Sequence, residues 1–477
     1  MEVLQRTANR GSVSTGNYEI DNSVKLEADN TEYLNRVIAS GGNRKTWTIS
    51  AWVKRTEISD ASHGGGHTIF AVNVSGNEGC LVRFNTGTTA ATLDTLQIDI
   101  GAGSTNSRSH TSQVFRDTSA WYHIVLAVDT TQGTATDRFK LYVNGELVTS
   151  YYSRNNPAQN FDTSNNQAAN SCTQHIGAYT SSGTAYGKFC GYIAEVNHVD
   201  GAALAPTAFG EFDDDSGIWI PIEASPTYGT NGFFLDFADS GNLGDDESGN
   251  GLDFTEVNIA AADQATDSPT NLFCTWSPLW AYLYQPTIKE GGTVAAYGDS
   301  TDENAKATIG LTNGKWYWEA KPSGTIGSQF IGIQTDGDSN LNSAQGILLN
   351  YTMTITPTGR YYSYAGSLSE SADQGWDLTA SDWLGIALDM DSGTQTIKYY
   401  KNGSLIQSLN LISEMQGQTV FPFLQNYENR TFNINFGGYT INTISSAASD
   451  ANGYGTFEYA PPTGYYAICT KNLAEYG

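Results

Sequence analysis

The sequence predicts an all-β protein with two antiparallel β-sandwiches in tandem. Apolar residues fall mostly on every second position in short segments such as residues 46–54, which is typical of strands that bury one face. The dipeptide Asn-Gly, which supplies the two positive φ angles of a tight hairpin turn, occurs at Asn144-Gly145 and again at Asn402-Gly403. Long helical periodicity and heptad runs are nearly absent. Two such hairpins far apart in the chain indicate two sandwiches.

The chain divides into four predicted parts. Residues 1–212 form the first sandwich and residues 286–440 the second. Residues 213–285 are a connecting region with some strands that belongs partly to the second sandwich, because the stretch is rich in glycine and acidic residues while apolar residues keep recurring. Residues 441–477 form a C-terminal tail that pairs with an edge strand, either of this subunit or of another protein.

The charge balance excludes some classes of partner. The 477 residues include 24 Lys+Arg and 50 Asp+Glu, which gives a formal net charge of −26. Sequence-independent binding to nucleic acid or to an anionic lipid surface needs a cationic face, so neither is expected. The sequence lacks a run of the ~18–20 apolar residues that would span a membrane, and it begins without the apolar run of a secretory signal. We therefore expect neither membrane insertion nor ordinary secretion.

The cysteines and histidines do not form a recognisable metal motif. The five cysteines are widely spaced and include no Cys-x-x-Cys pair. Cys172 and Cys190 are candidates to face each other across a hairpin, but buried thiols are the favoured interpretation, and the redox state of the two remains open. His63 and His67 flank a glycine triplet, which favours a loop over a zinc site.

Two acidic clusters offer oxygen ligands for calcium. The first is Asp213, Asp214 and Asp215, and the second spans residues 245–247. Neither spacing matches a defined calcium loop such as the EF-hand, so a solvated acidic loop is favoured. The sequence predicts no required cofactor, with calcium at Asp213–Asp215 as the alternative.

Aromatic residues gather in the second predicted sandwich, and Tyr361, Tyr362, Tyr364 and Trp376 are the candidate ligand-binding residues. Flat rings with polar handles cover apolar ligand faces at low entropic cost. The competing interpretation places Tyr361 and Tyr364 at core positions of a strand.

Both sandwiches resemble known families. Short strand motifs lie at residues 47–54, 121–129, 141–148, 176–179 and 191–196 of the first sandwich, and at residues 314–320, 331–334, 383–391, 399–406, 421–423 and 435–437 of the second. On these motifs the first 210 residues resemble the laminin-G-like, concanavalin A-like sandwiches, and residues 290–437 are similar to SPRY domains. The resemblance implies two concanavalin A-like antiparallel sandwiches of the jelly-roll type.

A third resemblance concerns function. Residues 43–55, 245–254, 267–271 and 461–465 resemble segments of virion proteins of tailed phages from marine bacteria. This implies a structural protein displayed on the virion, as a tail, fibre or capsid-surface component that mediates host-glycan adhesion or particle assembly. Other virion proteins and further copies of the chain in a homo-oligomer would be its partners. A cellular glycan-binding module is the alternative, and a glycan-degrading enzyme is the third hypothesis.

Catalysis is tested against the residues that concanavalin A-like glucanases use. Laminarinase-type enzymes carry three carboxylates on one strand, which the alternation of a strand places on the same face. Residues 19–21 and 211–213 each offer Glu-x-Asp, but the third carboxylate is missing from both. The sequence therefore predicts a protein that is not an enzyme.

Overall fold

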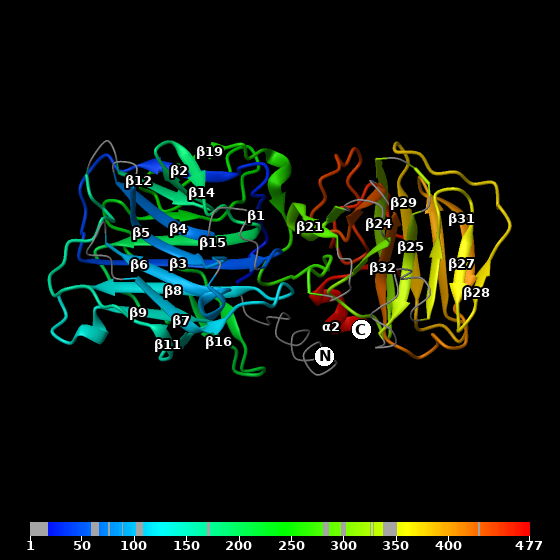
Figure 1. The fold of residues 1–477 in the computed structure, drawn as a ribbon, viewed down its shortest axis with the longest axis horizontal. Coiled ribbons are helices and arrows are strands. Elements are labelled where there is room, and N and C mark those ends of the chain that lie inside the picture. The colour runs from blue at the N-terminus through cyan, green and yellow to red at the C-terminus, as the bar shows by residue number, and fades with distance from the viewer. Residues whose placement is uncertain are drawn as a thin grey trace. The chain divides into compact units, whose positions relative to one another are not determined.

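The computed structural model describes residues 18–477 except 59–65, 75–76, 88, 102–107, 169–171, 280–285, 297–301, 325, 328, 337–350 and 428–429. The described residues form two compact units, the first ending at Thr270 and the second spanning Asn271–Gly477. Both are built from antiparallel sheets (Figure 1), which confirms the predicted all-β fold with two sandwiches.

The first unit contains two eight-stranded sheets, drawn in blue to green in Figure 1. Sheet A has the order β10 (Glu146–Leu147), β9 (Phe139–Val143), β8 (Tyr122–Asp129), β3 (Thr46–Arg55), β15 (Gly191–Asp200), β1 (Ser23–Leu26) and β20 (Gln264–Ala265), and β18 (Phe233–Leu235) also pairs with β15. Sheet B has the order β11 (Tyr151–Ser153), β7 (Arg108–Val114), β6 (Thr95–Ile100), β5 (Asn77–Phe84), β4 (His67–Val74), β12 (Cys172–Ile176), β2 (Tyr33–Val37) and β19 (Thr255–Val257). Two small hairpins are β13 (Tyr179–Ser181) with β14 (Thr184–Tyr186), and β16 (Gly210–Phe212) with β17 (Trp219–Pro221).

The core of this unit is formed by the alternating apolar residues of both sheets. Trp47 and Ile49 of β3 belong to the same buried cluster as Phe70 of β4 and Phe84 of β5. Trp47 is fully buried, and its indole Nε1 donates to Thr163 Oγ1 at 3.0 Å, so burial leaves this polar atom satisfied.

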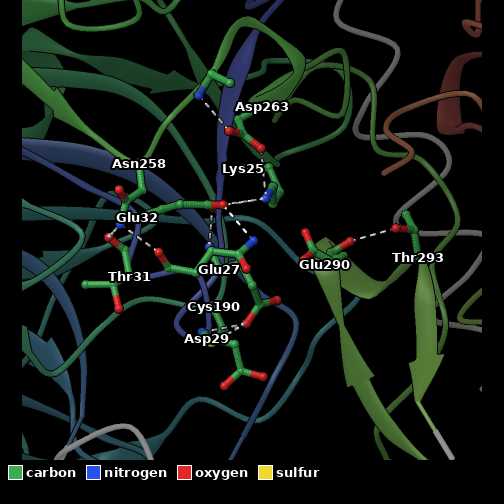
Figure 2. Close-up of polar contacts among 12 residues, drawn as sticks. Lys25, Glu27, Asp29, Thr31, Glu32, Cys190, Asn258, Asp263, Glu290 and Thr293 are labelled. Atoms are coloured by element: carbon green, nitrogen blue, oxygen red, sulfur yellow. Dashed lines mark hydrogen bonds and ion pairs between the residues drawn. The ribbon is translucent and has the colours of Figure 1, made fainter. Parts of the chain in front are cut away.

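The stretch 213–270 belongs to the first unit, whereas the sequence predicted a connecting region over 213–285. Its strands β18, β19 and β20 pair with β15, β2 and β1. Lys25 Nζ lies 3.0 Å from Glu32 Oε2 and 2.8 Å from Asp263 Oδ1 (Figure 2). Strand β18 lies within residues 232–237, where the sequence indicates a strand. Strands β19 and β20 are three and two residues long, too short for alternation to reveal them, and all three strands are held by pairing with strands distant in sequence.

The second unit contains two more sheets. Sheet C has the order β21 (Thr287–Lys289), β22 (Val294–Ala296), β33 (Arg430–Asn435), β24 (Lys315–Gly324), β29 (Leu384–Asp389), β30 (Thr396–Lys401) and β31 (Ser404–Asn410), and β34 (Tyr466–Ala467) also pairs with β24. Sheet D has the order β23 (Asp302–Lys306), β32 (Val420–Tyr427), β25 (Phe330–Thr335), β26 (Thr352–Ile355), β27 (Tyr361–Tyr364) and β28 (Leu368–Glu370). The helical elements are short: 3₁₀ turns at Ala90–Thr92, Ala135–Asp137, Pro206–Ala208, Ala261–Asp263 and Glu290–Gly292, and helix α2 at Thr470–Tyr476.

The C-terminal tail is part of the second unit. Strand β34 runs parallel to β24 beside Trp316 and Tyr317. The carboxylate of Glu319, also on β24, accepts hydrogen bonds from the backbone N–H groups of Glu458 and Tyr459, both at 2.8 Å. The tail therefore pairs with a strand of the same chain, but β24 is an interior strand that also pairs with β29 and β33, not the edge strand that the sequence predicted.

Local turn chemistry agrees with the sequence prediction. Asn144 and Gly145 have φ values of 48° and 80°, and Asn402 and Gly403 have φ values of 48° and 77°. These values match the two left-handed positions of a type I′ turn.

All five cysteines are buried thiols, and for Cys172 and Cys190 this is the favoured of the two sequence interpretations. Burial raises the pKa of Cys172 to about 12.

Candidate functional site

The outward face of sheet B carries a row of polar side chains that cross its strands. Val82 and Phe84 of β5 and Ile98 of β6 are core residues, so the intervening Arg83 and Gln97 point to the opposite face. The register extends the pattern, because Gln97 pairs with both Arg83 and His110, and Asp99 pairs with Arg108. We call Arg83, Gln97, Asp99 and Arg108 the polar row.

Hydrogen bonds connect the polar row from end to end. Arg83 donates to Gln97 Oε1 from Nε and Nη2, at 3.3 and 3.2 Å. The Gln97 amide donates to Asp99 Oδ2 at 3.1 Å. Arg108 donates to both carboxylate oxygens of Asp99 in a forked arrangement, with the shortest contact at 2.7 Å. Each charged group is therefore fixed by its neighbour, which gives the row a defined geometry before any ligand binds.

Two tyrosines lie beside this row on the β13–β14 hairpin. Tyr179 and Tyr186 stack with ring centroids 5.8 Å apart and planes 25° apart. The guanidinium carbon of Arg83 lies 5.7 Å from the centroid of the Tyr179 ring, within the range of a cation–π contact. We call Tyr179 and Tyr186 the tyrosine pair.

Accessibility separates the parts of this surface. Gln97 and Asp99 are almost fully buried, whereas the Arg108 side chain is 43% exposed and Tyr186 is 39% exposed. Burial, followed by the charge of Arg108, lowers the pKa of His110, so the neighbouring imidazole is neutral at pH 7. The exposed groups are thus a guanidinium with directed N–H donors and an aromatic ring with a hydroxyl. This combination suits a ligand that has both hydroxyl groups and an apolar face.

This site was not predicted from the sequence, although part of its signal is present there. Residues 82–84 and 96–100 alternate apolar and polar, which identifies Arg83, Gln97 and Asp99 as outward-facing. These side chains lie next to one another because β5, β6 and β7 are neighbours in the sheet, and the sequence did not show that strand order.

The predicted aromatic site in the second unit is divided by the structure. Trp376 is 7% exposed and belongs to the buried hydrophobic cluster of the second unit. The Tyr361 side chain packs against the same cluster, so both side chains point into the core. Alternation along β27 turns Tyr362 and Tyr364 to the other face. Tyr362 packs edge-on against Phe330 at 5.0 Å and donates to Glu370 Oε1 at 3.0 Å. Ligand binding at Tyr362 and Tyr364 stays a prediction.

The acidic cluster Asp213, Asp214 and Asp215 lies in the turn between β16 and β17. Asp213 Oδ1 accepts hydrogen bonds from Ser216 N at 2.7 Å and from Ser216 Oγ at 2.6 Å, and these bonds lower the pKa of Asp213. Asp214 and Asp215 are exposed. Closure of the turn accounts for Asp213, and a calcium ion at this cluster stays a prediction.

Comparison with known proteins places the first unit in a fold class. The family model of the concanavalin A-like lectin/glucanases superfamily matches residues 27–206, which include most strands of sheets A and B. Residues 27–206 therefore have the concanavalin A-like lectin fold that the resemblance implied for the first sandwich. No curated protein matches the chain in sequence.

Solved structures show weaker likenesses. A protein from Bacteroides ovatus whose proposed role is carbohydrate binding is 17% identical, with a TM-score of 0.35, and the match covers 50% of this chain and 58% of that one. The SPRY domain of human HERC1 is 14% identical, with a TM-score of 0.25, over 31% of this chain and 91% of the domain. Domains LG4-5 of the mouse laminin α1 chain are 9% identical, with a TM-score of 0.30, over 93% and 95% of the two chains.

Within the described residues, no helix is both long enough and apolar enough to cross a membrane.

Proposed function

We propose that this protein is a non-catalytic glycan-binding protein and that the polar row and the tyrosine pair form its binding face. The observation that carries the proposal is a hydrogen-bonded polar row on the outward face of a lectin-type sheet, with the exposed Arg108 at one end and the stacked tyrosine pair at the Arg83 end. Arg108 would donate to sugar hydroxyls, and Tyr186 would cover an apolar sugar face. The buried Gln97 and Asp99 hold Arg108 in place, so little ordering entropy is lost on binding.

The environments of two buried glutamates support the non-catalytic part. Burial raises the pKa of Glu195 to about 7, and it raises the pKa of Glu319 to about 7 as well. A raised carboxyl pKa is a feature of catalytic acids, but these two residues lie in different units. Glu195 accepts a hydrogen bond from the Tyr18 hydroxyl, and Glu319 holds the C-terminal tail. A role in the fold explains both.

A glycan array with the full chain tests the proposal, followed by titration calorimetry with the strongest glycan found. Arg108→Ala and Tyr186→Ala are each expected to weaken binding at least tenfold, about 1.4 kcal/mol. The matched controls are Lys140→Ala on β9 of sheet A and Phe212→Ala, an exposed ring on β16, and both should bind normally. An array without specific binding, or binding that both site variants retain, would refute the proposal.

Two further measurements test its other parts. Reducing-sugar release by the pure protein, if the Lys140→Ala and Phe212→Ala controls retain it, would show that the protein is an enzyme. Repeating the array in a calcium chelator tests the Asp213–Asp215 prediction, since loss of binding that Asp214→Asn reproduces would indicate a calcium site.

A location on a phage particle is a second proposal, supported by the resemblance of residues 43–55, 245–254, 267–271 and 461–465 to phage virion proteins. It would make the protein an adhesin or assembly component of a tail, fibre or capsid surface, present as a homo-oligomer among other virion proteins. Mass spectrometry of purified particles tests it. If the chain were absent from the particles, the remaining hypothesis would be a cellular glycan-binding module.

A further inference from the structure

The first unit brings together three metal-binding residue types that are far apart in the sequence. One donor atom from each of Glu57, His67 and Cys190 lies within 4.8 Å of the other two. All three side chains are buried, with His67 and Cys190 at 0% exposure and Glu57 at 6%. We propose that this cluster, the buried triad, binds a divalent cation of the zinc type.

The fold holds the three donors on separate, firmly placed segments. Glu57 follows β3 by two residues, His67 begins β4, and Cys190 directly precedes β15. β3 and β15 are neighbours in sheet A, and β4 lies within sheet B, so the triad joins the two layers. Donors that are held in or directly beside separate strands lose little conformational freedom when a metal binds.

The distances suit tetrahedral coordination. With Zn–S of about 2.3 Å and Zn–N or Zn–O of about 2.0 Å, tetrahedral donor atoms stand about 3.3–3.6 Å apart. The donor atoms lie within 4.8 Å of one another, so at that limit they would have to approach by about 1.2–1.5 Å to bind the metal together. Thiolate, imidazole and carboxylate together favour zinc over calcium, which prefers oxygen ligands only.

A second carboxylate stands next to the thiol. Cys190 Sγ lies 3.8 Å from Glu27 Oε1, to which it is joined in Figure 2. The backbone N–H of Asp29 donates to the same oxygen at 3.4 Å. Glu27 is thus placed either to complete the coordination shell or to neutralise the ion from just outside it.

The nearby cation is already paired. Arg55 Nη2 donates to Asp94 Oδ1 at 3.0 Å, and Arg55 Nη1 donates to the carbonyl of Phe115 at 2.7 Å. Its third contact, from Nε to His67 Nδ1, is long at 3.4 Å. Coordination through His67 Nε2 would place the ring proton on Nδ1 and end that contact, while the other two contacts of Arg55 would remain.

Formation of the complex releases one proton for each bound metal. The Cys190 S–H bond breaks, the sulfur lone pair forms the metal–sulfur bond, and the proton passes to the buffer. No oxidant or reductant takes part.

Cobalt(II) substitution tests the proposal in the full chain. The protein is treated with a chelator, refolded with and without Co²⁺, and titrated with Zn²⁺ in competition. We expect the protein to bind one equivalent of Co²⁺ and to show a thiolate-to-cobalt charge-transfer band in the near ultraviolet. Zn²⁺ should displace the Co²⁺, and the band should then disappear. Cys190→Ser should abolish the band, whereas Cys172→Ser, which alters another buried thiol of the same unit, should retain it.

A second variant covers the case in which Cys190→Ser does not fold. Glu57→Gln keeps the thiolate, so it should retain the band while lowering Co²⁺ affinity at least tenfold. Absence of saturable binding to the wild-type chain would overturn the proposal. Equal affinity in Glu57→Gln, or a band that survives in folded Cys190→Ser, would also overturn it.

Discussion

Replacing Asp267 by asparagine removes the charge that faces Lys54 in the interior of the first unit. Lys54 Nζ lies 2.6 Å from Asp267 Oδ2, and the two side chains are 0% and 1% exposed. Asp267 Oδ1 also accepts a hydrogen bond from the Trp121 indole at 3.0 Å. Asp267 lies within the stretch 213–285 that the sequence assigned to a connecting region, so this pair tests whether the stretch is integral to the sandwich.

Asp267→Asn is expected to cost about 3–5 kcal/mol, because it leaves the buried ammonium of Lys54 without that carboxylate. For a domain of this size the melting temperature should fall by about 6–20 °C, at roughly 2–4 °C per kcal/mol. Lys54→Met combined with Asp267→Leu removes both charges and should recover most of the loss.

Calorimetry and denaturant unfolding of the full chain measure the effect. Asp137→Asn is the matched control, because Lys140 Nζ and Asp137 Oδ1 are 3.7 Å apart with side chains 44% and 46% exposed, and its cost should stay below about 0.5 kcal/mol. A loss under about 1 kcal/mol for Asp267→Asn would refute the reasoning.

Three further predictions concern the rest of the chain. Burial raises the pKa of Glu319 to about 7 from its ordinary 4.5, so the stability of wild type relative to Glu319→Gln should be highest below pH 4.5 and fall by about 3 kcal/mol as the pH rises to 7.5; a pH-independent difference in denaturant unfolding would contradict this. Gly145 and Gly183 have nearly equal φ values of 80° and 82°, but an added Cβ would meet an indole carbon at 2.2 Å only at Gly145. Gly145→Ala should therefore cost about 1–3 kcal/mol more than Gly183→Ala, and equal melting temperatures would argue against this packing. Trp376→Ala should lower the free energy of unfolding by about 3–5 kcal/mol, because it truncates a core side chain, whereas Tyr364→Ala should lower it by under about 1 kcal/mol. The reverse order in chemical denaturation would contradict the core position of Trp376.

Much of the fold was predictable because its signals are local. The alternating residues 46–54 lie in the strand β3, and the two Asn-Gly pairs form tight turns with the required positive φ values. The apolar residues at 232–237 indicate the strand β18, but the short strands β19 and β20 were not located, because two or three residues are too few to display a period of two. Their place is fixed by hydrogen bonds to strands that lie far away in the chain.

The candidate sites followed the same division. Sequence composition drew attention to Tyr362 and Trp376 equally, and only packing showed that the second is a core residue. His67 stood out beside a glycine triplet, but its approach to Glu57 and Cys190 depends on the meeting of sheets A and B.

The sequence by itself determined the class of structure, the two-sandwich architecture, the sharp turns and the acidic character, because each of these is encoded in neighbouring residues or in their sum. Tertiary structure alone decided which polar side chains meet across strands, which carboxylates become buried, and where the boundary between the units falls after Thr270. Which side chains meet is set by strand order and register. These arise from contacts between segments distant in the chain, and no local sequence pattern encodes the energies of those contacts.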